Sequence, residues 1–197
     1  LATLDDKKQI TRVPIDPAYP VNTAWDLGYN DQTAIIFFQQ IGHNIHIVDY
    51  YENKNEAFPH YAQVLKEKDY IIEHNYGPHD LEQTEFGSGK TRREVAYQMG
   101  LRFRVVPRMP IEDGIHAVKM VLPRCFIDVD NCGPLVNALR HYHRKFSDKE
   151  RVYKVKPVHD WSSHAADAMR TLATGLNEIK FNNKVRQTNV DTNYKVL

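Results

Sequence analysis

The sequence has few cysteines, no long apolar segment and almost no net charge. Two cysteines, Cys125 and Cys132, are too few for a disulfide framework, lack the spacing of a zinc site and suit a reducing cytosol. No apolar run approaches the ~18–20 residues that a membrane span needs, and the N-terminus lacks a signal-peptide pattern, so no membrane partner is expected. A net charge of +1 does not by itself indicate a nucleic-acid-binding protein.

The length and composition are those of a chain with one hydrophobic core. At 197 residues and 42% hydrophobic, it can bury one sizeable core. Residues 1–20 are polar and contain three prolines, which predicts an N-terminal arm or linker. We expect the folded domain over residues 21–177 and a loose C-terminal tail over the polar residues 178–197.

Three apolar segments follow one another closely after the arm. The segments Val21–Leu27, Thr33–Gln39 and Asn44–Tyr51 predict strands, and their short connections favour an antiparallel meander. Helical patterns then alternate with short strands, which predicts a mixed α/β sheet, the meander followed by parallel strands, with helices on both faces. The predicted helices are 56–68, 91–99, 112–122, 133–145 and 160–176.

Three aspartates occupy positions from which they can share a metal ion. Asp26 ends the first predicted strand, Asp80 follows a strand that finishes at Gly77, and Asp167 lies beside the apolar stripe of the last helix. Two carboxylates ~4 Å apart repel by about 4 kcal/mol at an effective dielectric near 20, and a hard divalent cation removes this cost. The pattern therefore predicts a Mg²⁺ or Mn²⁺ site, the alternative being separate turn or cap roles.

Histidines accompany these acids and also occur elsewhere. His164 lies one helical turn before Asp167 on the same face, which suits a ligand, a proton relay or a group orienting Asp167; a histidine packed on the sheet is the alternative. Four others have spacings that suit zinc, but no matching cysteine or carboxylate cluster follows them, so we interpret them as structural or surface residues. They are His43, His46, His141 and His143.

Positive charge is concentrated in two runs. The first contains Lys90, Arg92 and Arg93 directly after a Gly-Ser-Gly segment. This segment resembles a phosphate-binding P-loop, but that motif needs glycine at position 84, where Thr84 stands, so ATP binding is not expected. We expect contact with a phosphate backbone instead, the alternative being a solvated basic face. The second run comprises Arg140, Arg144, Lys145, Lys149, Arg151, Lys154 and Lys156.

Three segments, DLGYNDQTAIIF, PHDLEQTEFGSGKTRREVA and HDWSSHAADAMR, together resemble the nuclease domain of tailed-phage large terminase subunits, over roughly residues 20–176. The resemblance implies a ribonuclease H-like fold and an endonuclease that cuts concatemeric double-stranded viral DNA during genome packaging. By matching motifs, it implies that Asp26, Asp80 and Asp167 bind metal and that His164 lies near the active site. Asp31 matches an acid of unassigned role.

The resemblance also implies partners and a place of action. The partners are double-stranded DNA, a packaging ATPase domain that this sequence lacks, the small terminase subunit and the portal, the last of which the tail after 178 would contact. The place is the cytoplasm of the infected bacterial host.

The predicted mechanism is hydrolysis with two metal ions. Asp26 would bridge two Mg²⁺ or Mn²⁺ ions about 3.5–4 Å apart, with Asp80 on one and Asp167 on the other. One ion would activate water for in-line attack and the other would stabilise the leaving 3′ oxygen. Two alternatives stay open: a junction resolvase or transposase-type nuclease of the same fold, and a catalytically silent module that docks on DNA or the portal.

Overall fold

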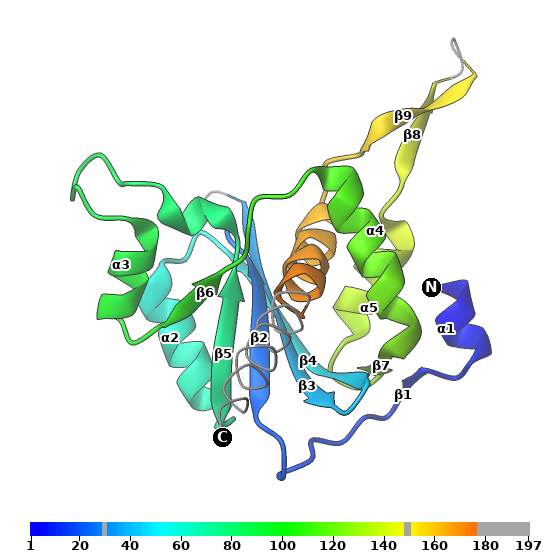
Figure 1. Cartoon of the computed structure of the whole chain (residues 1–197), viewed down its shortest axis with the longest axis horizontal. Coiled ribbons are helices and arrows are strands. Elements are labelled where there is room, and N and C mark those ends of the chain that lie inside the picture. Colours follow the sequence, from blue (N-terminus) through cyan, green and yellow to red (C-terminus); the bar gives the residue numbers. More distant parts are fainter. Residues whose placement is uncertain (29–30, 148–150, 177–197) are drawn as a thin grey trace, which may run out of the picture.

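The computed structural model describes residues 1–28, 31–147 and 151–176, which form one mixed sheet covered by helices (Figure 1). The sheet has seven strands in the order β1-β7-β4-β3-β2-β5-β6. They are β1 (Ile10–Thr11), β2 (Val21–Asp26), β3 (Gln32–Ile41), β4 (Asn44–Lys54), β5 (Ile72–Gly77), β6 (Phe103–Val105) and β7 (Cys125–Asp128).

The three central strands form the antiparallel meander that the sequence predicts. β3 pairs antiparallel with both β2 and β4. On either side of this meander the pairing is parallel: β5 pairs with β2, β6 with β5, and β7 with β4. The prediction of an antiparallel meander followed by parallel strands is therefore confirmed.

β3 carries apolar side chains on both of its faces, so both faces of the sheet must be covered. Ile36 and Phe38 belong to one core cluster, whereas Ile35 and Phe37 belong to the other. Successive side chains of a strand point to opposite faces, so this run requires a helical layer on each face.

Helices supply those two layers (Figure 1). α4 (Ile111–Val121), α5 (Gly133–His141) and the helix at 163–176 pack on the face of Ile36. α2 (Phe58–Glu67) and α3 (Arg92–Gln98) pack on the opposite face, where the ring of Trp25 makes edge contacts with Tyr61 and Phe103. The remaining helical elements are α1 (Ala2–Asp6), η1 (His79–Glu82) and η2 (Leu122–Arg124).

The largest difference from the predicted helix boundaries is at the end of α5. The helix predicted to reach residue 145 ends at His141, and the backbone at Tyr142 turns to a ψ of 115°. β8 (Arg144–Ser147) follows and pairs antiparallel with β9 (Val152–Pro157). The two strands form a hairpin that projects from the body of the domain (Figure 1), so pairing with β9 overrides the helical pattern of these residues.

The first residues pack on the sheet. Leu4 and Val13 are buried, and β1 pairs parallel with β7. The side-chain amide of Gln9 donates hydrogen bonds to the carbonyls of Pro123 and Cys125, at 3.1 and 3.0 Å. The domain boundary at residue 20 stays a prediction, and the predicted tail at 178–197 lies outside the described residues.

Within the part of the chain that the structure describes, no helix is both long and apolar enough to cross a membrane.

The helix at 163–176 packs closely on the sheet through small residues. Ala165, Ala168 and Ala173 are buried on its inner face. A Cβ atom at Gly175 would lie 2.6 Å from Cδ1 of Tyr76, whose ring is buried in the same cluster. These small residues determine how near the side chains at the start of this helix come to the strand ends.

We expect Gly175→Ala to lower the free energy of unfolding by about 1–3 kcal/mol, because the added methyl group overlaps a buried ring. Thermal unfolding followed by circular dichroism should show a Tm lower by roughly 2–4 °C for each kcal/mol. Gly133→Ala is the matched control, since a Cβ there meets no atom within 4 Å. An unchanged Tm for Gly175→Ala would contradict the close packing.

Candidate functional site

The site is built around a contact between the end of β2 and the start of the last described helix. Asp26 is the final residue of β2, and His164 lies in the first turn of the helix at 163–176. Nδ1 of His164 is 3.1 Å from Oδ2 of Asp26. Their side chains are only 13% and 21% exposed, respectively, so water screens this pair weakly.

The protonated form of His164 is favoured in this position. The hydrogen bond to Asp26 raises the pKa of His164 above 6.5, and the charges of Asp26, Asp31 and Asp167 raise it further, whereas burial lowers it. The three acids are therefore close enough to act on one imidazole. A protonated His164 neutralises part of their negative charge.

Asp167 lies one turn further along the same helix and pairs with Arg170. Nε of Arg170 donates to Oδ1 of Asp167 at 3.0 Å. Burial raises the pKa of Asp167 and the charge of Asp26 raises it further, against the opposing effect of Arg170. Asp26 thus lies close enough for its charge to act on Asp167. The role of Arg170 was missed, although its i,i+3 spacing from Asp167 was a usable signal.

Asp80 emerges at the same edge of the sheet but makes other contacts. β2 and β5 are parallel neighbours, so their C-terminal ends meet at one edge, and Asp80 follows β5 in η1. Its Oδ1 accepts a hydrogen bond from Nε2 of Gln83 at 2.8 Å and lies 3.4 Å from Nε2 of His79. Its side chain is 43% exposed.

The three predicted ligands do not form a closed cage in the described part of the chain. Among those residues, Asp26, Asp80 and Asp167 are not a set whose ligand atoms all lie within 4.8 Å of one another. Asp26 is hydrogen-bonded to His164 and its charge raises the pKa of Asp167, while Asp80 lies on η1. Their joint role as metal ligands stays a prediction.

Asp31 lies near the end of β2. The Thr33 hydroxyl donates to the carbonyl of Gly28 at 2.8 Å and accepts from its N–H at 3.2 Å. A Cβ at Gly28 would lie 3.0 Å from Cβ of Asp31, so a larger residue at position 28 would crowd Asp31. These contacts hold Asp31 directly before β3, where its charge acts on His164.

The donor set at this edge suits a hard divalent cation. Carboxylate oxygens predominate, and they are the ligands that Mg²⁺ and Mn²⁺ prefer. Burial is the largest cause that raises the pKa of Asp167, and the charge of Asp26 adds to it. A bound cation would stabilise the charged carboxylate.

The first basic run begins in the segment that follows Asp80 and continues into α3. Thr84 and Thr91 pair as an isolated bridge, and Thr91 caps α3 in a capping box with Glu94. Arg93 is bonded to Glu82 at 2.7 Å, so part of its charge is already compensated. The other two predicted DNA contacts, Lys90 and Arg92, are exposed.

Comparison with known proteins gives a consistent set of matches. No protein-family model matches the chain. The large terminase subunit of Escherichia phage T5 is 23% identical to it over 161 residues. The match covers 79% of this chain and 35% of the T5 protein, so the chain spans about a third of that relative's length.

Solved structures show the same architecture. The P22 large terminase nuclease domain superimposes with a TM-score of 0.62 at 18% identity, covering 86% of this chain and 89% of that one. The chain is similar to the nuclease domain of phage large terminases. The large terminase of thermophilic bacteriophage D6E gives a TM-score of 0.64 at 16% identity, over 85% of this chain and 43% of that one.

A further match is the large terminase nuclease domain of bacteriophage SPP1, solved with bound Mn. It has a TM-score of 0.55 at 12% identity and covers 77% of this chain and 84% of the other. The predicted resemblance to terminase nuclease domains and the ribonuclease H-like fold are therefore confirmed.

We expect Asp26→Asn to lower the pKa of His164 in the metal-free protein, because the largest cause of its elevation is lost. A raised pKa means that the Asp26–His164 pair stabilises the fold fully below pH ~6.5 and loses this contribution as pH rises through the folded-state pKa. Histidine titration by NMR measures the midpoint. Asp69→Asn, at an exposed position, should leave it unchanged. The same His164 midpoint in Asp26→Asn as in the unmodified chain would contradict the pairing of Asp26 with His164.

Proposed function

We propose that this chain is the nuclease domain of a phage large terminase subunit, a divalent-metal-dependent endonuclease that cuts concatemeric double-stranded viral DNA during genome packaging. The observation that carries the proposal is the grouping of Asp26, His164 and Asp167 where β2 ends and the helix at 163–176 begins, with Nδ1 of His164 3.1 Å from Oδ2 of Asp26. The likeness to the T5, P22 and SPP1 terminases supports it.

Asp26, Asp80 and Asp167 are proposed to hold Mg²⁺ or Mn²⁺, two ions during the reaction. The manganese bound to the SPP1 domain supports a divalent metal of this class. Metal bound there would supply activation of the attacking water and stabilisation of the charge on the leaving 3′ oxygen.

The residues of this chain orient one another for that task. Asp26 is the last residue of β2, which pairs with β3 on one side and with β5 on the other. The backbone from which its carboxylate extends is therefore rigid. The Nδ1 N–H of His164 donates to Oδ2 of Asp26 and restrains its rotation. Arg170 holds Asp167 from the next turn of the helix.

The DNA is proposed to be held by its phosphates beside Asp80. Lys90 is exposed just before α3, Arg92 is exposed at the first residue of that helix, and the ring of Phe86, between Asp80 and Lys90, is fully exposed. Contacts of this kind bind duplexes with little dependence on sequence.

The partners and the site of action follow from the proposed identity. The packaging ATPase domain, the small terminase subunit and the portal are the proposed protein partners, in the cytoplasm of the infected host. The chain spans only part of the large terminases it matches, so these partners are proposals about the whole protein.

We expect Asp26→Asn to reduce cleavage of linear duplex DNA in Mn²⁺ by roughly a hundredfold or more while the fold is retained. Gel analysis of the products measures cutting, and circular dichroism checks the fold. Asp69→Asn is the matched control: this exposed residue has a φ of 53°, which asparagine tolerates, and it should cut normally. Cutting by Asp26→Asn at the rate of the unmodified chain would remove Asp26 from the chemistry. Strong preference for branched DNA would favour the resolvase alternative.

Replacing both Lys90 and Arg92 by alanine should weaken duplex binding to a similar extent on unrelated sequences, because these side chains contact phosphate rather than bases. The slope of log affinity against log salt should fall by about 2, since each phosphate contact contributes about 0.9. Fluorescence anisotropy over a salt series measures this. The matched control replaces two exposed lysines elsewhere, Lys66 of α2 and Lys119 of α4, and should leave the slope as it was. A sequence-dependent loss would argue against a phosphate contact.

A further inference from the structure

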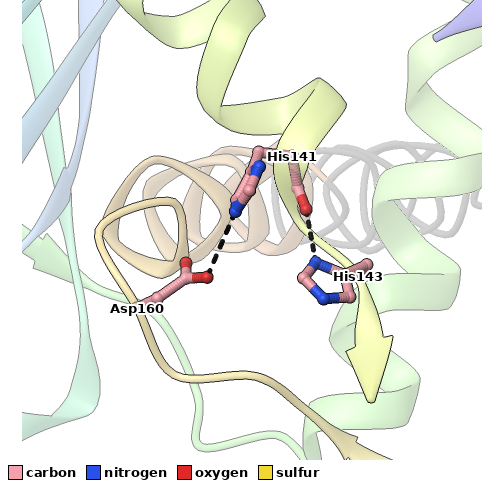
Figure 2. A group of neighbouring side chains, drawn as sticks. All are labelled: His141, His143 and Asp160. Atoms are coloured by element: carbon pink, nitrogen blue, oxygen red, sulfur yellow. Dashed lines mark hydrogen bonds and ion pairs between the residues drawn. The ribbon is translucent and has the colours of Figure 1, made fainter. Parts of the chain in front are cut away.

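Two histidines and an aspartate converge outside the proposed nuclease site. His141 is the last residue of α5, His143 precedes β8, and Asp160 precedes the helix at 163–176. One potential ligand atom from each lies within 4.8 Å of those of the other two. Figure 2 shows the three side chains grouped where the end of α5 meets the chain returning from the β8–β9 hairpin.

The spacing of this group is close to that of a tetrahedral metal site. Nε2 of His141 is 3.5 Å from Oδ2 of Asp160. Ligands bound at about 2.0–2.1 Å around tetrahedral zinc lie roughly 3.3 Å apart, so this pair already has the required separation. The ligand atom of His143 lies within 4.8 Å of those of the other two residues. Its side chain is exposed and has room to move the ångström or so needed to reach the tetrahedral separation.

Hydrogen bonds to neighbouring groups orient Asp160 and His143. Oδ1 of Asp160 accepts from the N–H and the hydroxyl of Ser162, at 2.9 and 2.6 Å, while Oδ2 faces His141. Nδ1 of His143 lies 2.7 Å from the carbonyl oxygen of His141, and since a carbonyl only accepts, Nδ1 must carry the proton. Nε2 of His143 then has the lone pair that a metal requires. Such backing contacts are typical of metal-ligating histidines.

The donor set indicates the class of cation. Two imidazoles and one carboxylate favour a borderline metal such as Zn²⁺ over the hard Mg²⁺, and three protein ligands leave one position for water. His141 is exposed and Asp160 half-buried, so a cation reaches the group from solvent. Hydrogen bonds to Ser162 lower the pKa of Asp160, and the two histidines lower it further, so it is charged near neutral pH.

We propose that His141, His143 and Asp160 bind Zn²⁺ at a site separate from the carboxylates of the proposed nuclease centre. The metal would join the end of α5, the base of the β8–β9 hairpin and the start of the helix that carries His164. The site rests on its own geometry and does not depend on the proposed nuclease activity.

The test is a calorimetric titration of the full chain with Zn²⁺ in excess Mg²⁺, which occupies carboxylate sites. One saturable Zn²⁺ site is expected in the unmodified chain. His141→Ala and His143→Ala should each weaken it by roughly tenfold or more. His116→Ala, at an exposed histidine of α4, is the matched control and should bind Zn²⁺ normally, as should Asp26→Asn. Circular dichroism checks that each variant is folded.

A spectroscopic measurement locates the metal independently. The ring of Trp161 lies 5.0 Å from that of His141, whereas the second tryptophan, Trp25, is buried on the other face of the sheet. Co²⁺ bound in place of Zn²⁺ should quench the fluorescence of Trp161. This quenching should be absent in Trp161→Phe. The proposal is overturned if the unmodified chain has no saturable Zn²⁺ site, if both histidine variants bind as tightly as the unmodified chain, or if Asp26→Asn abolishes binding.

Discussion

The close approach of the helix at 163–176 to the sheet determines the geometry of the proposed site. Only small inner residues such as Ala165 and Ala168 allow His164 to reach Asp26 at 3.1 Å. The same approach brings Asp167 near enough to Asp26 for the charge of Asp26 to raise its pKa. Burial of Met169 and Leu172, at about 1.5–3 kcal/mol each, holds the helix in this position.

Local patterns were enough to predict most of the architecture. The alternation along β3, the short connections of the meander and the apolar stripe of the last helix are all periodicities within one segment. His164 and Asp167 could be placed on one face of the helix in the same way, because they are one helical turn apart. Asp26 could be placed at a strand end for an equally local reason.

The sequence could not predict which charges are already paired. Arg93 is bonded to Glu82, and Arg144 of the second basic run is bonded to Glu112, contacts that join residues 11 and 32 positions apart. Counting charge along the chain therefore overestimates the charge available to a phosphate backbone. Asp80 shows the same limit, since its strand-end position was predictable but its contacts with Gln83 and His79 depend on the local fold of η1.

The histidine cluster was missed for a topological reason. His141 and His143 have a metal-binding spacing, but the acid that faces them follows only after the chain has made the β8–β9 hairpin and returned. Helical periodicity also favoured extending α5 through this region, which would have carried His143 onto a helix. The chain instead leaves the helix at Tyr142, and that turn places His143 near Asp160.

Asp160 connects the two clusters physically. One of its oxygens bonds Ser162 at the start of the helix and the other faces His141, while His164 lies one turn further on and contacts Asp26. A ligand that restrains Asp160 would therefore also restrain the first turn of the helix, on which His164 is carried. Oxygen-rich and imidazole-rich donor sets prefer different cations, so both clusters can be filled without competing for one metal. On this argument the imidazole cluster orients the carboxylate site through the helix and takes no part in its chemistry.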